Sequence, residues 1–406
     1  MEGQETILNF NCDMTVTLAL AAILLLLGHL IKRLVPLLRR FFIPAPVVGG
    51  LFFAAITLIG HNTNSFTFTF DSSLKNLLMT AFFTSVGFLA SLRFLYRGGL
   101  AVGMFLIASL ILIVIQNVAG ISLAHLFGLN PLIGIATGSV SLAGGHGTAG
   151  AFGPVLEEFG LDAGLSVSIA AATFGLVAGS MIGGPIGKLL LNRKKIKCEN
   201  SSSQHSVKSE DAYEDDDPKA FGERGLFAAV VFLILAMGVG YFIILGLKRI
   251  DLVFPAYLGP MLVAAIIRNI CDFTRKPIPM HTIGIVGSLS LQFFLAMALM
   301  TLKLWELAAL AVPLVTILLV QTVIMGLFSY FVTFKIMGGD YDAAVISCGQ
   351  CGFGMGATPN AMANMETFTG ANGPSDKAFF VVPLVGSLFI DFFNAFIITS
   401  FIHIVL

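Results

Sequence analysis

The stretch from Ile43 to Ile56 reads IPAPVVGGLFFAAI, and residues 254–266 repeat its pattern as FPAYLGPMLVAAI. Further pairs follow in the same order: FF at 82–83 and 293–294, VIQNV at 114–118 with LVQTV at 319–323, and GGHGT at 144–148 with GFGMGAT at 352–358. The two members of each pair are separated by 205 to 211 residues. The chain therefore consists of two related halves. In a very apolar chain such halves indicate a secondary transporter, because these folds are often built from inverted repeats.

The composition places the chain in a membrane. Of the 406 residues, 56% are apolar and 11% are charged, and the mean hydropathy is +0.91. Soluble domains carry roughly a quarter charged residues, so lipid must cover this surface. Residues 1–13 contain three acids and no lysine or arginine, so we expect the first apolar run to stay as a membrane helix. The lipid bilayer is thus an expected partner, and nucleic acid is not.

Long apolar runs predict an all-α polytopic membrane protein. Each run has the length of about 20 residues that a helix needs to cross the hydrocarbon layer. The predicted helices cover residues 14–31, 44–60, 74–96, 98–127 and 163–190 in the first half, and 225–247, 254–270, 281–303, 305–336 and 377–403 in the second. A glycine-rich segment precedes the last helix of each half, at residues 131–155 and 342–368.

The domain boundaries follow from one polar stretch. Residues 192–224 are serine-rich and acidic, and they carry too few apolar groups to offset the entropy of ordering. We expect a disordered cytoplasmic linker there, between an N-terminal repeat at 1–191 and a C-terminal repeat at 225–406.

Lysine and arginine predict the orientation. With the N-terminus outside and five crossings in each half, 19 of the 23 basic residues fall at cytoplasmic ends or in the linker. The other four are Lys75, Lys248, Arg249 and Lys303. This distribution follows the positive-inside rule, and it places both termini in the periplasm. An odd number of crossings gives the two repeats inverted topology.

The crossing count also requires both glycine-rich segments to be re-entrant hairpins. Re-entrant backbone is tolerated at membrane depth only where protein buries it or where it lines a wet cavity. In the alternative, each segment spans the membrane once, the halves become six-helix units, and the charge bias weakens.

The two predicted hairpins form the candidate substrate site. The tip of a broken helix exposes backbone N–H groups and the positive end of a dipole, both of which attract carboxylates. Glycine lets a substrate approach that backbone. The candidate substrate-binding residues are Ser141, Gly144, Gly145, His146, Gly147 and Thr148 in the first hairpin, and Gly352, Gly354, Gly356, Thr358, Asn360 and Asn364 in the second. The alternatives are close helix packing for the glycines and a hydrogen bond to a neighbouring carbonyl for His146.

Asp391 is the candidate ion ligand. It lies mid-helix in the apolar run FIDFFNAF at 389–396, where a charge costs about 2.5–3.5 kcal/mol even on lenient insertion scales. Asn394 follows one turn later, and hard cations such as Na⁺ prefer oxygen ligands. We therefore expect Na⁺ at Asp391 and Asn394, with Thr173 as a further ligand or a helix cap. A bond to a substrate ammonium group and a buried structural role remain alternatives for Asp391.

Other polar groups in the membrane favour structural roles. Gln116, Asn117 and Gln321 occupy related places in the two halves, which favours hydrogen bonds across helices. Cys348 and Cys351 form a C-x-x-C, but the setting is glycine-rich and no second pair follows. Packing is therefore favoured over redox or metal chemistry.

Enzyme signatures are absent from the sequence, which contains no G-x-S-x-G, H-E-x-x-H or G-x-x-x-x-G-K-[ST] pattern. We expect no catalytic residues and no cofactor, and an ion gradient must then drive transport. A passive channel is an alternative because glycine-rich re-entrant segments also build ion filters. The related halves favour a carrier.

Six stretches match a known pattern: SLAGGHGT at 141–148, ATFGLV at 172–177, FFLAMALM at 293–300, LKLWELA at 302–308, YDAAV at 341–345 and CGFGMGATP at 351–359. Together they resemble the bacterial sodium:glutamate symporter family, through both halves and nearly end to end. The acidic, serine-rich linker departs from that pattern.

The resemblance implies a secondary carrier of the bacterial inner membrane that couples L-glutamate uptake to inward Na⁺ movement. It also implies two inverted five-helix repeats with re-entrant loops, as in the sodium:citrate carriers. The glycine-rich loops of the family correspond to residues 144–148 and 352–358. A homodimer with a scaffold part and a moving transport part is expected by the same similarity. The alternatives are another dicarboxylate or amino acid as cargo, and protons as the coupling ion.

Overall fold

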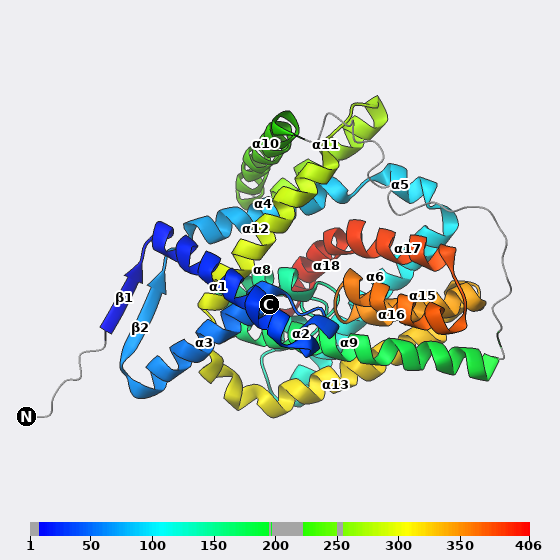
Figure 1. Ribbon diagram of the computed structural model, residues 1–406, viewed down its shortest axis with the longest axis horizontal. Coiled ribbons are helices and arrows are strands. Elements are labelled where there is room, and N and C mark those ends of the chain that lie inside the picture. Colours follow the sequence, from blue (N-terminus) through cyan, green and yellow to red (C-terminus); the bar gives the residue numbers. More distant parts are fainter. Residues whose placement is uncertain (1–7, 195, 197–221, 250–254) are drawn as a thin grey trace, which may run out of the picture.

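The structure is a computed structural model that describes residues 8–194, 196, 222–249 and 255–406. Most of the predicted linker at 192–224 lies outside the described residues. Within them the chain is helical apart from one small sheet and short connections (Figure 1).

The first half contains nine described helices. They are α1 (Met14–Leu34), α2 (Pro36–Arg40), α3 (Ala45–Thr63), α4 (Ser73–Leu89), α5 (Leu92–Arg97), α6 (Gly99–Leu126), α7 (Leu132–Ala136), α8 (Gly145–Glu158) and α9 (Gly164–Lys194).

The described part of the second half is also helical. Its elements are α10 (Glu223–Lys248), α11 (Leu258–Thr274), α12 (Met280–Met300), the 3₁₀ helix η3 (Leu304–Leu310), α13 (Ala311–Phe328), the π-helix η4 (Ser329–Thr333), α14 (Phe334–Ile336), α15 (Tyr341–Gly354), α16 (Thr358–Asn372), α17 (Asp376–Leu388) and α18 (Ile390–Val405).

Seven spans of the described chain are long and apolar enough to cross a membrane: α1, α3, α6, α9, α10, α12 and the run Ala311–Ile336. The pair of α17 and α18 is an eighth candidate. Large apolar side chains on these helices stay exposed; Leu26, Phe242 and Val312 have exposed fractions of 73%, 70% and 76%. Because such a surface requires lipid around it, the chain is a multi-pass membrane protein, as predicted.

One small parallel sheet joins two strands, β1 (Leu8–Cys12) and β2 (Phe66–Phe70), which pair in register from Leu8↔Phe66 to Cys12↔Phe70. The prediction of a purely helical fold missed it. The sequence of β2, FTFTF, alternates apolar and polar residues as a half-buried strand does. Its phenylalanines are half-buried, while the hydroxyls of Thr67 and Thr69 donate to the side chains of Asn9 and Asn11.

The predicted helix 74–96 is two helices, because α4 ends at Leu89 and α5 begins at Leu92. Asn269 of α11 occupies the break. Its Nδ2 donates to the Ala90 carbonyl at 2.8 Å, and its Oδ1 accepts from the Leu92 N–H at 2.8 Å. A side chain from another helix thus replaces the backbone hydrogen bonds that a continuous helix would make.

Two further predicted helices are also interrupted. The predicted helix 305–336 starts with the 3₁₀ turn η3 and contains the π-helix η4. The predicted helix 377–403 breaks at Phe389, where α17 and α18 are bent by 46°. Pro383 and Gly386 weaken the last turns of α17. As a result Asp391 lies in the first turn of α18 and not in the middle of a helix.

The helices pack as two bundles. In the first bundle (α1, α3, α4 and α10–α12), α4 packs on α11 and α12, α3 packs on α1 and α12, and α10 packs on α11. In the second bundle (α6–α9, α13 and α15–α18), α9 packs on α8, α15 and α16, and α6 contacts α7, α13, α17 and α18. Figure 1 shows the first bundle on the left and at the top, and α8 reaches across to α12.

Glycines set two equivalent helix crossings in the first bundle. A Cβ on Gly49 of α3 would lie 2.0 Å from the Leu24 carbonyl oxygen of α1. A Cβ on Gly259 of α11 would lie 2.3 Å from the Gly240 carbonyl oxygen of α10. Only glycine permits backbones to come this close. Gly49 and Gly259 lie in the two similar stretches of sequence, 43–56 and 254–266.

Candidate functional site

Two helical hairpins lie in the second bundle, and their tips touch. The first hairpin joins α7 to α8, and the second joins α15 to α16 through residues 355–357. Gly145 has a φ of +59°, and a Cβ there would lie 2.8 Å from the Gly356 carbonyl oxygen. Glycine is therefore required at this tip both for its left-handed backbone and for the contact with the second tip.

Side chains from both halves hold the first hairpin. The Ser139 N–H donates to Asn117 Oδ1 at 2.9 Å, and the Ser139 carbonyl accepts from Asn394 Nδ2 at 3.0 Å. Both amides are buried. The peptide groups before the first tip are thus fixed from α6 on one side and from α18 on the other.

The second hairpin is held through α6 as well. Gln116 Nε2 donates to the Gly354 carbonyl at 2.7 Å, and Gln321 Nε2 of α13 donates to the Gln116 carbonyl at 2.7 Å. The prediction that Gln116, Asn117 and Gln321 make structural hydrogen bonds across helices is confirmed. Gln116 and Asn117 are neighbours on α6, so one turn of this helix contacts both hairpins.

Two asparagines of α16 bind the second hairpin to α9. Asn360 Nδ2 donates to the Leu176 carbonyl at 3.0 Å and to Ser180 Oγ at 2.6 Å. Asn364 Nδ2 donates to the Gly179 carbonyl at 2.9 Å. Their donor groups are therefore occupied within the protein. The Asn360 Oδ1 is buried and accepts no hydrogen bond from the described residues.

A cavity of about 490 Å³, the central cavity, lies where the tips meet the first bundle. It brings together seven of the predicted site residues: Gly144, Gly145, His146, Gly356, Thr358, Asn360 and Asp391. The cavity also reaches Ser85 on α4, Ser288 on α12 and Ser387 on α17. Its volume falls within the range of small-molecule sites, about 300–1,000 Å³.

Three helices begin at this cavity. Gly145 starts α8, Thr358 starts α16, and Asp391 is the second residue of α18. The positive end of a helix dipole and its free N–H groups favour an anion. Asp391 is half-buried and supplies that anion for α18, with no ion pair among the described residues. The starts of α8 and α16 remain for an anionic ligand.

His146 and Thr173 contact each other beside the cavity. His146 Nε2 lies 3.0 Å from Thr173 Oγ1, which in turn donates to the Ile169 carbonyl at 2.9 Å. Because the single hydroxyl proton is used by that carbonyl, Nε2 must donate to Thr173, and Nδ1 is left as an acceptor. The partner of His146 is thus a hydroxyl and not the carbonyl given above as the alternative.

The other predicted site residues do not line the cavity, and they pack the hairpins. Ser141 donates to the Ser168 carbonyl at 2.8 Å, and a Cβ on Gly352 would lie 2.6 Å from Ala361 N. The residues predicted at the site but outside its lining are Ser141, Gly147, Thr148, Thr173, Gly352, Gly354, Asn364 and Asn394.

The first bundle contributes lining residues that the sequence patterns did not predict. Ser85 and Ser288 lie in apolar helices on the side of the cavity that faces the tips. A serine in an apolar helix can indicate a binding site. A serine whose hydroxyl only donates to a carbonyl of its own helix has the same sequence pattern, so the two cases cannot be separated from sequence.

Comparisons with known proteins agree on one family. The sodium/glutamate symporter family model matches residues 10–374. A sodium/glutamate symporter from Haemophilus influenzae is 41% identical over 382 residues, which cover 93% of this chain and 94% of that protein. The sodium/glutamate symporters from Escherichia coli (strain K12) and Shigella flexneri are each 40% identical over 402 residues, covering 97% of this chain and 98% of theirs.

Proposed function

The chain belongs to the sodium/glutamate symporter family, and from that premise we propose that it imports L-glutamate by symport with Na⁺ across the bacterial inner membrane. It is a transporter and not an enzyme. The observation that carries the proposal is that one cavity is lined by both glycine-rich tips and by Asp391.

The carboxylates of glutamate bind the N-terminal ends of α8 and α16. Gly144, Gly145 and His146 contribute from one tip, and Gly356 and Thr358 contribute from the other. Free N–H groups at a helix start need no further charge to hold an anion. The predicted residues outside the lining, such as Ser141 and Asn364, act by fixing the shape of the tips.

Sodium binds oxygen atoms around the first hairpin and α18. Asp391 offers a carboxylate to the cavity. Deeper in the protein, Asn394 Oδ1 and Ser139 Oγ are buried and have no hydrogen-bond partner in the described chain. The two residues already contact each other, and hard cations prefer such oxygens. Thr173 supports this region through His146.

Sodium coupling follows from charge. Without a cation, Asp391 repels the carboxylates of the substrate in the same cavity. Bound Na⁺ offsets that charge and favours the conformation that holds glutamate. A ligand shifts a conformational equilibrium only by its different affinity for the two states, and each ligand here improves the site for the other.

Two inverted repeats with re-entrant hairpins explain the architecture. The support is the equivalent glycine crossings of α1 with α3 and of α10 with α11, together with the Gln116–Gln321 contact between α6 and α13. The boundaries are the predicted ones, 1–191 and 225–406. The homodimer stays a prediction, which light scattering of the purified protein in detergent tests.

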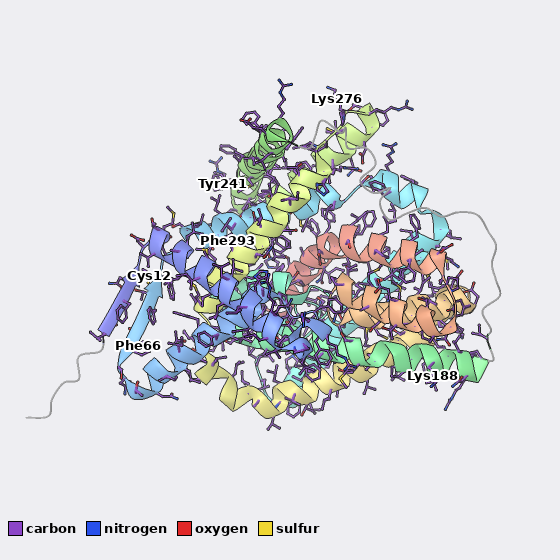
Figure 2. The ribbon with its side chains drawn as sticks, viewed as in Figure 1. Cys12, Phe66, Lys188, Tyr241, Lys276 and Phe293 are labelled. Carbon is purple, nitrogen blue, oxygen red and sulfur yellow. The ribbon has the colours of Figure 1, made fainter. Side chains whose placement is uncertain are left out.

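The orientation follows the positive-inside rule. Figure 2 shows Lys188 and Lys276 on the side of the molecule opposite to Cys12 and Phe66. With both termini periplasmic, the β1–β2 sheet is external. The central cavity is then lined from the cytoplasmic ends of α4 and α12, by Leu89 and Gly284. We infer that this conformation faces the cytoplasm.

The test is uptake of labelled L-glutamate into proteoliposomes with and without an imposed Na⁺ gradient. Uptake should require the gradient, and aspartate, citrate and D-glutamate as competitors define the cargo. Uptake that ignores Na⁺ would end the proposal. Competition by citrate equal to that by L-glutamate would instead indicate a dicarboxylate carrier.

A further inference from the structure

A second cavity, of about 400 Å³, lies between the same two bundles. It is lined by Lys75, Met79 and Thr80 from the first turns of α4, whereas the central cavity meets the later turns of that helix. The two cavities share no lining residue. The two cavities therefore follow one another along α4, the second cavity at its N-terminal turns and the central cavity at its C-terminal turns. We name the second one the Tyr257 cavity.

Three aromatic rings lie beside the Tyr257 cavity. Tyr257 stacks on Phe83 of α4 with ring centroids 4.3 Å apart, and its edge meets Phe152 of α8 at 5.5 Å. All three side chains are almost fully buried. Phe83 also contacts Phe82, which lines the central cavity. The rings thus lie between the two cavities and separate a ligand in the Tyr257 cavity from the central cavity.

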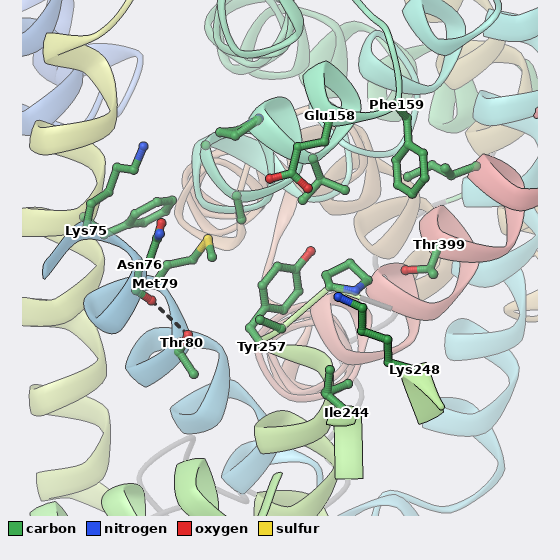
Figure 3. A pocket seen from close by; sticks show the side chains of 18 of the residues that line it. Lys75, Asn76, Met79, Thr80, Glu158, Phe159, Ile244, Lys248, Tyr257 and Thr399 are labelled. Carbon is green, nitrogen blue, oxygen red and sulfur yellow. Dashed lines mark hydrogen bonds between the residues drawn. The ribbon is translucent and has the colours of Figure 1, made fainter. Parts of the chain in front are cut away.

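The polar groups of the Tyr257 cavity come from four helices, α4, α8, α10 and α18, and from the residues before α11. Figure 3 shows Lys75 on one side, Lys248 on the other, Glu158 across from them and Tyr257 in the middle. No ion pair within 4 Å joins Lys75, Lys248 or Glu158 to another described residue, although the Glu157 carboxylate attracts Lys75 over a longer distance. The Tyr257 hydroxyl is buried and has no hydrogen-bond partner in the described chain.

The Tyr257 hydroxyl lacks a partner that a ligand could supply, because a buried polar group without a hydrogen bond is destabilising. Lys75 is half-buried, and Lys248 and Glu158 are exposed. Charged groups that line a cavity raise the local concentration of ions of opposite charge. Two ammonium groups and one carboxylate are the complement of an acidic amino acid, which carries two carboxylates and one ammonium group.

We propose that the Tyr257 cavity is a second binding site for acidic amino acids, which holds the substrate before it reaches the hairpin tips. Lys75 and Lys248 bind the two carboxylates, Glu158 binds the ammonium group, and the Tyr257 hydroxyl donates to a carboxylate. The identity of the ligand rests on the proposed function. Lys75 and Lys248 are also two of the four basic residues assigned to the periplasmic side, so the site faces incoming substrate.

The first experiment measures equilibrium binding of labelled L-glutamate to the purified full-length protein, in choline buffer and in sodium buffer. The wild-type protein should bind glutamate without Na⁺ at the Tyr257 cavity and gain a second, Na⁺-dependent component at the tips. The double variant Lys75→Gln/Lys248→Gln should weaken the Na⁺-free component by about tenfold. Its Na⁺-dependent component should remain.

Lys303→Gln is the matched control. Lys303 is exposed, is assigned to the same side, and pairs with Glu306 at 3.1 Å outside the cavity. Lys303→Gln removes one positive charge on the same side of the membrane and should leave both components unchanged. A wild-type protein without Na⁺-free binding, or a double variant that binds like wild type, would overturn the inference. If Na⁺-driven uptake and the Na⁺-dependent component are absent as well, the proposed function fails instead.

A second variant tests the ammonium contact and does not depend on the lysines. Glutarate has both carboxylates of glutamate and lacks its amine. In wild type it should displace Na⁺-free glutamate about tenfold less well than L-glutamate does. Glu158→Gln should remove that preference, and Tyr257→Phe should weaken both ligands while keeping the ring stack. An unchanged preference in Glu158→Gln would contradict the proposed pose.

Discussion

Asp391 combines a charge with a special backbone position. It follows a break between two helices, lies in the first turn of α18 and faces the central cavity. A helix N-terminus favours a carboxylate, and no ion pair joins Asp391 to another described residue. The carboxylate is therefore the predicted cation ligand.

Replacing Asp391 with asparagine removes the charge and keeps the size of the side chain. We expect the Na⁺ concentration for half-maximal glutamate uptake to rise by about tenfold or more, with little loss of folded protein. Na⁺-titrated uptake in proteoliposomes measures this. Glu366→Gln is the control, since Glu366 is an exposed acid of α16 outside the cavity. Wild-type Na⁺ activation in Asp391→Asn would exclude Asp391 as an ion ligand.

Gly145 is constrained by its backbone conformation and by its contact with the second tip. Alanine at this position would meet the Gly356 carbonyl and would strain a left-handed backbone, at a cost of about 1 kcal/mol or more. Gly145→Ala should reduce the uptake rate by at least roughly tenfold, because misplaced tips no longer fit the substrate. Gly103→Ala, on an open face of α6 with no atom within 4 Å, should transport normally. Equal activity of the two variants would refute the role of the touching tips.

At the scale of the element, the break between α4 and α5 depends on Asn269. Besides its two bonds at the break, Asn269 Nδ2 donates to the Ala265 carbonyl at 2.8 Å. Nearby, Asp272 accepts from the Ser91 hydroxyl and pairs with Arg268 at 3.0 Å. The end of α11 therefore fixes the segment through which the first bundle continues into α6.

Asn269→Ala removes the side-chain partners of the Ala90 carbonyl and the Leu92 N–H at the break, which costs about 1 kcal/mol. We expect a lower Tm of the purified protein, measured in detergent by intrinsic fluorescence. Asn372→Ala is the comparison, since Asn372 is exposed and bonds only to the Phe368 carbonyl of its own helix. An equal Tm of the Asn269→Ala and Asn372→Ala variants would show that the break needs no side-chain support.

The same break explains which elements could be predicted from the sequence. Helices such as α6 and α9 follow from long apolar runs, and their observed ends lie within a few residues of the predicted ones. The ends of α4 and α17 lie inside continuous apolar runs. In α4 a distant residue, Asn269, supplies the missing hydrogen bonds, and no local pattern records that.

Some residues of the candidate site could be predicted from the sequence, and others could not. The glycine clusters stand out in the sequence because they occupy matching places in the two halves, and Asp391 stands out because a charge is unusual in a membrane helix. The amides of Asn360, Asn364 and Asn394 also stood out, but the structure uses their donor groups to hold backbone carbonyls. Whether a polar side chain meets a ligand or a neighbouring carbonyl depends on tertiary packing.

At the scale of the whole molecule, the central cavity and the Tyr257 cavity both lie between the two bundles. Gly147 and Gly150 of α8 face Phe82 and Leu295 of the first bundle. At this contact α8 has a smooth surface of small residues, which packs against large apolar side chains of the first bundle. Movement of the second bundle along it would carry the tips from one side of the membrane to the other.

A cross-link across this contact should stop such movement. Cysteines in place of Gly150 and Leu295, in a chain without other cysteines, would be joined by a short bifunctional reagent. We expect uptake to fall below about a tenth of its value before cross-linking. The control pair replaces Asn9 and Thr67, which face each other across the β1–β2 sheet. Full transport after the first cross-link would exclude relative movement of the bundles at α8.

Each hairpin uses amides or carbonyls from the half of the chain to which it does not belong: Asn394 for the first, Gln116 and α9 for the second. On the proposal that the two halves are inverted repeats, a protein made of one half alone would have had neither pocket wall complete. Two such polypeptides, inserted in the membrane in opposite orientations, would have completed both, and a gene fusion would then have made that pairing permanent.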